Sequence, residues 1–263
     1  MKRFFVLVVL SICAVALPAS ASDSSKEGPA TKPSPEQCLK MLKEGNARFV
    51  SGKPLRPHAD LSRVKLAGSV NQKDYAYATI LACSDSRVPV ELIFDVGVMD
   101  LFVVRVAGNV ANVDEIGSIE YGLAHVNTPI LVVLGHTQCG AVAAVAAALQ
   151  GKGHALERNI PPLVAPIKPA VMRAIALHPE AGDAAMSLYA VEENVWQSIE
   201  DLFMKSPAVR DLVVARKVAV MAAIYDVGAG SVSWLPESKV SEILKKVSES
   251  PERALSPMAD THP

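Results

Sequence analysis

Residues 128–150, TPILVVLGHTQCGAVAAVAAALQ, join two kinds of sequence pattern through a short turn. The first eight residues are a mainly aliphatic run, which predicts a buried strand of a parallel sheet. The alanine-rich run that begins at Gly140 predicts a helix, because alanine has the highest helix propensity. His136 and Cys139 stand between the two. The pattern therefore predicts a strand that delivers a histidine and a cysteine to the start of a helix.

Two earlier segments repeat the pattern of a strand followed by a turn. Residues 75–83, YAYATILAC, and residues 101–109, LFVVRVAGN, predict strands, and residues 114–127 have helical spacing. Alternating strands and helices favour an α/β fold with a mainly parallel central sheet flanked by helices. Open parallel sheets bind ligands outside the carboxyl ends of their strands. Cys83, the last residue of the first strand, is therefore expected beside the histidine and cysteine of the later turn.

An amphipathic helix is predicted over residues 34–53. Ser34 is a candidate N-cap with Gln37 three residues later, which is the spacing of a capping box. We expect this helix to be interrupted near Gly45. Cys38 is expected to pack in the core as a small hydrophobic residue.

The carboxyl-terminal part of the chain adds further elements. Residues 187–205 predict a helix, and a shorter helix follows it. Residues 218–226 predict a buried strand and residues 231–235 an edge strand, joined by a glycine-containing turn. Trp196 and Trp234 are predicted to be packing residues.

The composition bounds the class of protein. The chain has 263 residues, with 26 basic and 27 acidic side chains and a formal net charge of −1. This balance gives no basic face for nucleic acid and no polybasic run for anionic lipid, so a small-molecule role is favoured. The length suits one domain, which we assign to residues 34–250.

The N-terminus is typical of an exported bacterial protein. Residues 1–21 have a basic start, an apolar run and small residues before cleavage after Ala21, which indicates a signal peptide and a periplasmic location. The apolar run is shorter than the roughly 20 residues that span a bilayer, so a retained anchor is disfavoured and no stable membrane insertion is expected. Residues 22–33 are predicted to be a flexible leader and residues 251–263 a disordered tail.

Three cysteines remain after removal of the signal peptide. Cys38, Cys83 and Cys139 are an odd number, which argues against a closed set of disulfides in an oxidising compartment. A bound metal would protect such thiols. Cys83, His136 and Cys139 supply three ligands and leave the fourth position of a tetrahedral site open, as in catalytic zinc sites. Two thiolates favour zinc over magnesium, calcium or manganese, and we expect one Zn²⁺ per chain.

Asp85 and Arg87 follow Cys83 in the motif CSDSR. One interpretation is an ordinary surface ion pair, which contributes little to stability. The other interpretation is chemical: the aspartate accepts the hydrogen of a zinc-bound hydroxide and orients it, while the arginine holds the aspartate off the metal. The spacing of the motif is compatible with both interpretations.

Four motifs together resemble those of the β-class carbonic anhydrases: CSDSR, RVAGN and GHTQCG, with LKEGNARF upstream. The resemblance extends from about residue 34 to residue 235. It implies a zinc enzyme that interconverts carbon dioxide and bicarbonate, built as a homodimer that often pairs into a dimer of dimers. By this resemblance the three ligands named above bind the zinc, and Asp85 and Arg87 are the catalytic pair.

The resemblance also implies a substrate pocket. Phe102 and Tyr121 stand where the family has aromatic residues lining it, although core packing is the alternative for both side chains. Gln72 resembles a pocket glutamine that the family contributes across the dimer interface, and Gly108 of RVAGN is a further pocket residue. Ile80 stands where regulated members carry a tryptophan. This difference favours an open site, in which the aspartate does not bind the metal, although Arg105 matches an arginine that the regulated members use in the same pocket.

The motifs thus predict the reversible hydration of carbon dioxide to bicarbonate and a proton by zinc-bound hydroxide. Zinc lowers the pKa of a bound water, and carbonic anhydrase is itself the usual example. The first alternative is a relative with the same zinc and fold that hydrolyses carbonyl sulfide or carbon disulfide. The second is a thiol redox or metal-buffer protein in which Cys83 and Cys139 form a reversible disulfide, which leaves Asp85, Arg87 and His136 without a role.

Overall fold

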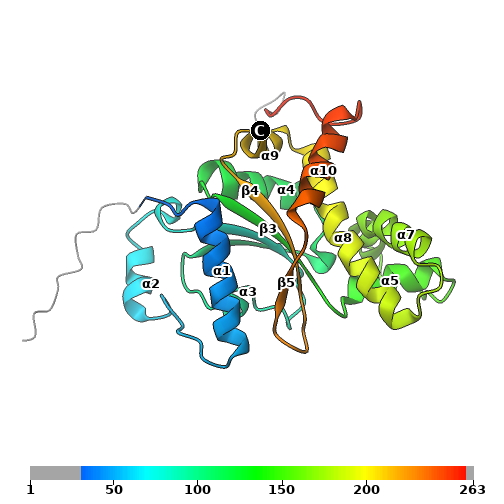
Figure 1. Ribbon diagram of the computed structural model, residues 1–263, viewed down its shortest axis with the longest axis horizontal. Coiled ribbons are helices and arrows are strands. Elements are labelled where there is room, and N and C mark those ends of the chain that lie inside the picture. Colours follow the sequence, from blue (N-terminus) through cyan, green and yellow to red (C-terminus); the bar gives the residue numbers. More distant parts are fainter. Residues whose placement is uncertain (1–30, 259–263) are drawn as a thin grey trace, which may run out of the picture. The chain divides into compact units, whose positions relative to one another are not determined.

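The computed structural model describes residues 31–258 (Figure 1). The predicted signal peptide, the leader up to residue 30 and the tail from residue 259 lie outside the described residues. Within the described part of the predicted tail, residues 251–258 contain no helix or strand. All structural statements below therefore concern residues 31–258.

A five-stranded sheet in the order β2-β1-β3-β4-β5 forms the centre of the described chain. Neighbouring strands run parallel except for β5, which pairs antiparallel with β4 at one edge. The prediction of an α/β fold with a mainly parallel sheet is confirmed. The strands are β1 (Ala78–Ala82), β2 (Leu101–Arg105), β3 (Ile130–His136), β4 (Ala219–Tyr225) and β5 (Val232–Trp234).

Helices separate most of the strands and cover the sheet (Figure 1). The α-helices are α1 (Pro35–Val50), α2 (Leu61–Ala67), α3 (Val90–Ile93), α4 (Val113–Glu120), α5 (Gly140–Leu149), α6 (Ile160–Val164), α7 (Lys168–Leu177), α8 (Asp183–Lys205), α9 (Pro207–Val214) and α10 (Glu237–Glu249). Short helical turns are η1 (Gln72–Asp74), η2 (Ala107–Asn109), η3 (Tyr121–His125) and η4 (Ala165–Ile167).

Side chains of the central strands alternate between two apolar layers. Ile80 of β1 packs in the layer formed with α1 and α3, whereas Leu81 packs in the layer formed with α4, α8 and α10. Every residue of β1 and β3 is buried. Apart from Thr79 and His136, these two strands are apolar, as expected for parallel strands that are covered on both faces.

Helix α1 begins as predicted but is not interrupted. The Ser34 hydroxyl accepts a hydrogen bond from the Gln37 N–H at 3.3 Å, and the Ser34 N–H donates to Gln37 Oε1 at 2.8 Å, which completes the capping box. The predicted interruption near Gly45 is wrong. A Cβ at Gly45 would overlap the Phe94 carbonyl oxygen, so this glycine allows close approach within a continuous helix. Cys38 is fully buried, as predicted.

The carboxyl-terminal strands and the tryptophans confirm the predictions. Strand β4 is largely buried, and β5 is the antiparallel edge strand. Trp196 is buried in the core, and the Trp234 ring packs beside Phe94 with 6.4 Å between the ring centroids. The predicted helix over residues 187–205 begins four residues earlier, at Asp183 in α8.

Helices α2, α6, α7 and α10 were not predicted. Figure 1 shows α5 and α7 gathered against one end of the long helix α8. Within the described residues, Ile160–Leu177 is the one stretch long and apolar enough to cross a membrane. Its length and hydropathy are weak evidence for a membrane span, because core helices of other proteins have the same length and hydropathy. Ala170, Val171 and Ala174 of this stretch are buried in the core.

The second strand ends earlier than predicted. Strand β2 stops at Arg105, and residues 107–109 form the turn η2 instead of continuing the strand. Gly108 and Asn109 both have left-handed backbone conformations, with φ of 77° and 44°. Such residues cannot continue an extended strand, so the chain turns here beside the carboxyl end of β1.

Candidate metal centre

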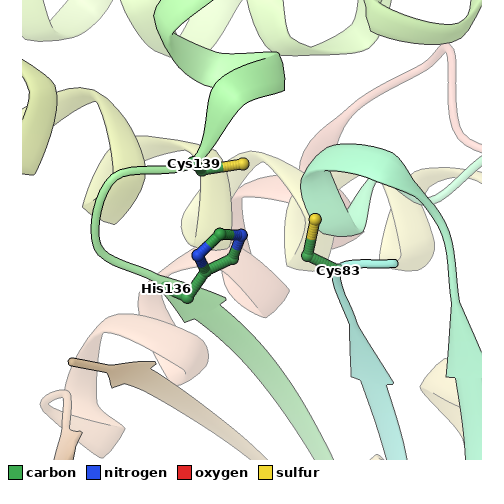
Figure 2. Close-up of side chains that lie close together, drawn as sticks. All are labelled: Cys83, His136 and Cys139. Carbon is green, nitrogen blue, oxygen red and sulfur yellow. The ribbon is translucent and has the colours of Figure 1, made fainter. Parts of the chain in front are cut away.

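Three candidate ligands converge at the carboxyl edge of the sheet (Figure 2). Cys83 directly follows β1, His136 is the last residue of β3, and Cys139 is the N-cap of α5. Their ligating atoms all lie within 4.8 Å of one another. All three side chains are buried, with His136 fully so. Because β1 and β3 are parallel neighbours, their carboxyl ends meet, and Cys83 lies beside His136 and Cys139.

The His136 ring has one nitrogen engaged and one free. Its Nδ1 lies 2.9 Å from the Thr137 carbonyl oxygen, so Nδ1 carries the hydrogen and Nε2 carries the lone pair. Nε2 is buried and has no hydrogen-bond partner among the described residues. A buried polar atom without a partner is costly, and a metal ion would satisfy this one.

The Cys83 sulfur accepts hydrogen bonds from two backbone groups. The Gly108 N–H lies 3.3 Å from Sγ and the Asp85 N–H lies 3.5 Å away. The neighbouring Cys139 thiol is the largest cause that lowers the pKa of Cys83, to about 4, and the nearby His136 ring and the backbone donors add to it. The proximity of the Cys83 sulfur in turn raises the pKa of Cys139. A bound cation would let both sulfurs ionise.

The donor set fits a soft divalent metal. Two thiolates and a neutral imidazole match the ligands that zinc prefers, and together they balance a double positive charge. Among the described residues, this trio is the one group of histidine, cysteine and carboxylate side chains close enough to share an ion. Three protein ligands leave a fourth tetrahedral position open for a reacting molecule.

Asp85 and Arg87 form a closely paired unit beside these ligands. Asp85 Oδ1 accepts from the Arg87 backbone N–H at 2.9 Å and from Nε at 3.0 Å, and Oδ2 accepts from Nη2 at 2.7 Å. These hydrogen bonds hold the pKa of Asp85 well below its usual range. The carboxylate is thus turned to Arg87 in this structure, and the open form of the metal site expected from Ile80 stays a prediction.

Arg87 also reaches the turn that carries the other two ligands. Its Nη2 donates to the Gln138 carbonyl oxygen at 3.1 Å and its Nη1 to Gln138 Oε1 at 3.3 Å. Gln138 stands between His136 and Cys139 and has a left-handed backbone with φ of 57°. Arg87 therefore links the CSDSR loop to the turn that carries His136 and Cys139, and the chemical role of Asp85 and Arg87 stays a prediction.

Arg105 clamps the CSDSR loop from β2. Its Nε donates to the Cys83 carbonyl oxygen at 3.0 Å and its Nη2 to the Asp85 carbonyl oxygen at 2.7 Å. These contacts of Arg105 and Gln138 were not predicted from the sequence. The available signals were the place of Arg105 at the end of a predicted strand and the place of Gln138 between two predicted ligands.

The predicted pocket residues lie apart from the ligands within one chain. Phe102 and Tyr121 lie beside each other, with ring centroids 6.0 Å apart. Phe102 pairs with Thr79, four residues before Cys83, which is about 13 Å along the strand. Gln72 is exposed in η1, before the amino end of β1. A pocket role for these three residues stays a prediction that requires a second chain.

Gly108, the fourth predicted pocket residue, is buried against the ligands. Its N–H is the 3.3 Å donor to the Cys83 sulfur. A Cβ added here would lie 2.7 Å from Ile167 Cδ1 and 3.2 Å from Ala141 Cβ. Close packing and the left-handed backbone together make glycine the residue that fits this position.

Comparisons with known proteins point to one family. A family model described as carbonic anhydrase matches residues 78–232. A carbonic anhydrase of Mycolicibacterium smegmatis is 35% identical over 198 residues, which cover 75% of this chain and 92% of that protein. Carbonic anhydrase 2 of Mycobacterium tuberculosis is 36% identical over 197 residues, covering 74% of this chain and 90% of its own length.

Solved structures support the same fold. A β-carbonic anhydrase of Aspergillus fumigatus superposes with a TM-score of 0.60 at 24% identity, covering 81% of this chain and 97% of that one. The β-carbonic anhydrase of Coccomyxa superposes with a TM-score of 0.58 at 23% identity, covering 75% of this chain and 86% of that one.

Proposed function

The chain belongs to the β-class carbonic anhydrases, and on this premise we propose that it interconverts carbon dioxide and bicarbonate with a zinc ion held by Cys83, His136 and Cys139. The observation that carries the proposal is the buried Nε2 of His136, which has no hydrogen-bond partner within residues 31–258 and belongs to a trio whose ligating atoms lie within 4.8 Å of one another. Hydration joins one carbon dioxide and one water to give bicarbonate and one proton.

The metal supplies the activation of water. When bound, zinc acts as a Lewis acid that lowers the pKa of a coordinated water, a property for which carbonic anhydrase is the usual example. The thiolates of Cys83 and Cys139 offset the charge of the ion, and the Thr137 carbonyl fixes the ring of His136 with Nε2 toward it. The protein thus contributes a fixed and nearly neutral site.

Asp85 orients the attacking water. Its Oδ1 already accepts two hydrogen bonds from Arg87, whereas Oδ2 accepts one and keeps a second lone pair. We assign Oδ2 as the acceptor of a hydrogen bond from the water, which directs the water's remaining lone pair toward carbon dioxide. Because Arg87 holds the pKa of Asp85 well below its usual range, Asp85 orients the water and leaves the released proton to solvent or buffer.

We also propose that the active form is a homodimer or a dimer of dimers. Strand β2 is the parallel edge of the sheet and is only partly buried in one chain. Val113 and Tyr121 on the neighbouring helical segments are 80% and 51% exposed. An unpaired edge beside exposed apolar residues is typical of an interface. Two β-carbonic anhydrases of Sordaria macrospora are tetrameric. Light scattering coupled to size-exclusion chromatography tests this proposal, and a monomer would contradict it.

Export to the periplasm is a further proposal, supported by the sequence of residues 1–21 alone. We expect the mature chain to begin at Ser22 and to be present in the periplasmic fraction. N-terminal sequencing of the protein from that fraction tests the proposal. A cytoplasmic chain that retains Met1 would contradict it.

The proposed activity is tested by offering one zinc-quantified preparation three substrates: carbon dioxide, carbonyl sulfide and carbon disulfide. We expect rapid hydration of carbon dioxide, with one zinc per chain. Turnover of the sulfur compounds without hydration of carbon dioxide would contradict the proposal. Metal-free protein with a quantitative Cys83–Cys139 disulfide would contradict it as well and favour a redox role. Cys139→Ser should lose the zinc and the activity together.

A further inference from the structure

Helix α8 carries two buried polar side chains that reach the turn beside the metal centre. Asn194 is 1% exposed, and its Nδ2 donates to the Gly108 carbonyl oxygen at 2.7 Å. The Ser198 hydroxyl lies one helical turn further, 2.9 Å from the Asn109 carbonyl oxygen and 2.9 Å from the Asn194 carbonyl oxygen of its own helix. Each carbonyl of the left-handed pair therefore has a side-chain donor on α8 within hydrogen-bond distance.

The turn held by α8 supplies a donor to a candidate ligand. The Gly108 N–H lies 3.3 Å from the Cys83 sulfur, and the Gly108 carbonyl is the one bound by Asn194. The two groups belong to the same left-handed residue, with φ of 77°. Fixing the carbonyl of Gly108 therefore limits the directions in which its N–H can point.

Close approach of α8 to the sheet makes this contact possible. A Cβ at Gly135, the residue before His136, would lie 2.6 Å from Val195 Cγ2. Only glycine lets α8 lie this close to the end of β3. The histidine ligand and the Asn194 contact are thus set by the same packing of α8 on β3.

Stability alone is a poor explanation for Asn194. Apart from Gln197 and Ser198, the buried stripe of α8 around Asn194 is apolar, and Asn194 Oδ1 has no hydrogen-bond partner among the described residues. A half-satisfied buried amide costs free energy relative to a well-packed apolar side chain. The neighbours that define the stripe are Val191, Val195, Ile199 and Leu202.

We propose that Asn194 is a positioning residue of the metal centre. Asn194 holds the Gly108–Asn109 turn so that the Gly108 N–H donates to the Cys83 sulfur, and this hydrogen bond in turn sets the affinity of the site for the metal. This inference rests on the proposed function, because it requires that Cys83 is a ligand. Groups that orient a metal ligand typically change metal affinity by about 10-fold to 100-fold when removed. We expect a loss of this size in Asn194→Ala.

The chain offers a matched control in Asn46. It is also a buried asparagine on a helix, with Nδ2 donating to the Ile93 and Gly230 carbonyl oxygens at 3.1 and 2.9 Å and Oδ1 accepting from the Val232 N–H at 2.9 Å. It lies in α1, and its partners Ile93, Gly230 and Val232 are neither candidate ligands nor part of the turn at residues 107–109. Asn46→Ala is therefore expected to lower the melting temperature without changing metal affinity.

The experiment measures Co²⁺ and Zn²⁺ affinity by chelator competition in the full-length wild type, Asn194→Ala and Asn46→Ala, together with the thiolate-to-cobalt charge-transfer absorption. We expect Asn194→Ala to lose at least about 10-fold in affinity relative to Asn46→Ala. Its charge-transfer band should move to longer wavelength, because the sulfur loses a hydrogen-bond donor. A smaller loss, or an unmoved band, would overturn the inference.

Two further results keep the test decisive. If Asn194→Ala does not fold, Ser198→Ala is judged by the same two criteria, since its hydroxyl lies within hydrogen-bond distance of the other carbonyl of the turn. If the wild type itself binds neither metal, the proposed function fails and the inference fails with it. Normal metal binding in wild type with unchanged binding in the variants overturns the inference alone.

Discussion

Gly108→Ala is the substitution whose cost follows most directly from the geometry of the centre. An alanine at φ of 77° pays about 1–2 kcal/mol for the left-handed backbone. The new Cβ would lie 2.7 Å from Ile167 Cδ1, and overpacking of this kind costs about 1–3 kcal/mol. Reduced freedom of the unfolded chain returns about 0.5 kcal/mol. The free energy of unfolding should therefore fall by about 2–4 kcal/mol.

A second substitution separates the two contributions. Ile167→Val removes the Cδ1 atom that the new methyl group would meet, and alone it costs about 0.5–1.5 kcal/mol. In the double variant the packing contribution should largely disappear, whereas the backbone contribution should persist. The double-mutant cycle is thus expected to give a favourable coupling of about 1–2 kcal/mol.

Equilibrium unfolding in urea gives the free energy of unfolding of the wild type, Gly108→Ala, Ile167→Val and the double variant. All four are measured at saturating zinc and one fixed protein concentration, because metal binding and oligomer formation change the apparent stability. A coupling within about 0.5 kcal/mol of zero would refute the placement of Ile167 against Gly108. A cost below about 1 kcal/mol for Gly108→Ala would refute the left-handed conformation itself. Either result would remove the structural reason for glycine at this position.

Three other substitutions test separate parts of the structure. Arg87→Gln removes the guanidinium that holds the pKa of Asp85 below its usual range. In a carboxyl ¹³C NMR titration the pKa of Asp85 should therefore rise toward about 4. An unchanged pKa would contradict the pairing of Asp85 with Arg87. Burial raises the pKa of Cys38 to about 11, so its contribution to stability is present below about pH 8.5 and is lost as the pH rises through about 11. Cys38→Ala should therefore make the alkaline fall in unfolding free energy shallower, and an unchanged slope would count against this assignment. Lys32 donates to three backbone carbonyl oxygens near the start of β1 and the end of η3. Lys32→Met should therefore lower the unfolding free energy by about 1–3 kcal/mol without changing the rate of carbon dioxide hydration. No loss of stability would contradict these contacts.

The sequence predicted the parts of the fold that depend on local pattern. The apolar runs that became β1 and β3 were recognisable because both strands are covered on both faces. The positions of Cys83 and His136 then followed from the rule that parallel strands end at a common edge. Strand order and the antiparallel pairing of β5 depend on contacts between distant segments.

The errors came from glycines whose role is set by tertiary contacts. Gly45 suggests an interrupted helix when read locally, but in the structure it admits the Phe94 carbonyl to a continuous α1. Gly108 belongs to a predicted strand, yet its left-handed conformation begins the turn at the metal centre. Neither contact leaves a signal within the neighbouring residues.

The outer supports of the site were missed for a related reason. Asn194 and Ser198 are four residues apart on an otherwise apolar stripe of α8, which is a pattern that can be read from sequence. What they bind cannot be read in this way, because Gly108 precedes Asn194 by 86 positions in the chain. Polar residues within an apolar helical stripe are the signal to look for.

The central claim is that Asp85 orients the attacking water at a zinc ion held by three other residues. Stopped-flow hydration of carbon dioxide by wild type and Asp85→Asn, each with its zinc content measured, tests this most directly. We predict one zinc per chain in both proteins and a hydration rate at least about 100-fold lower in the variant. Equal hydration rates in the two zinc-loaded proteins would contradict the role of Asp85. A wild type that holds zinc but does not hydrate carbon dioxide would contradict the proposed function.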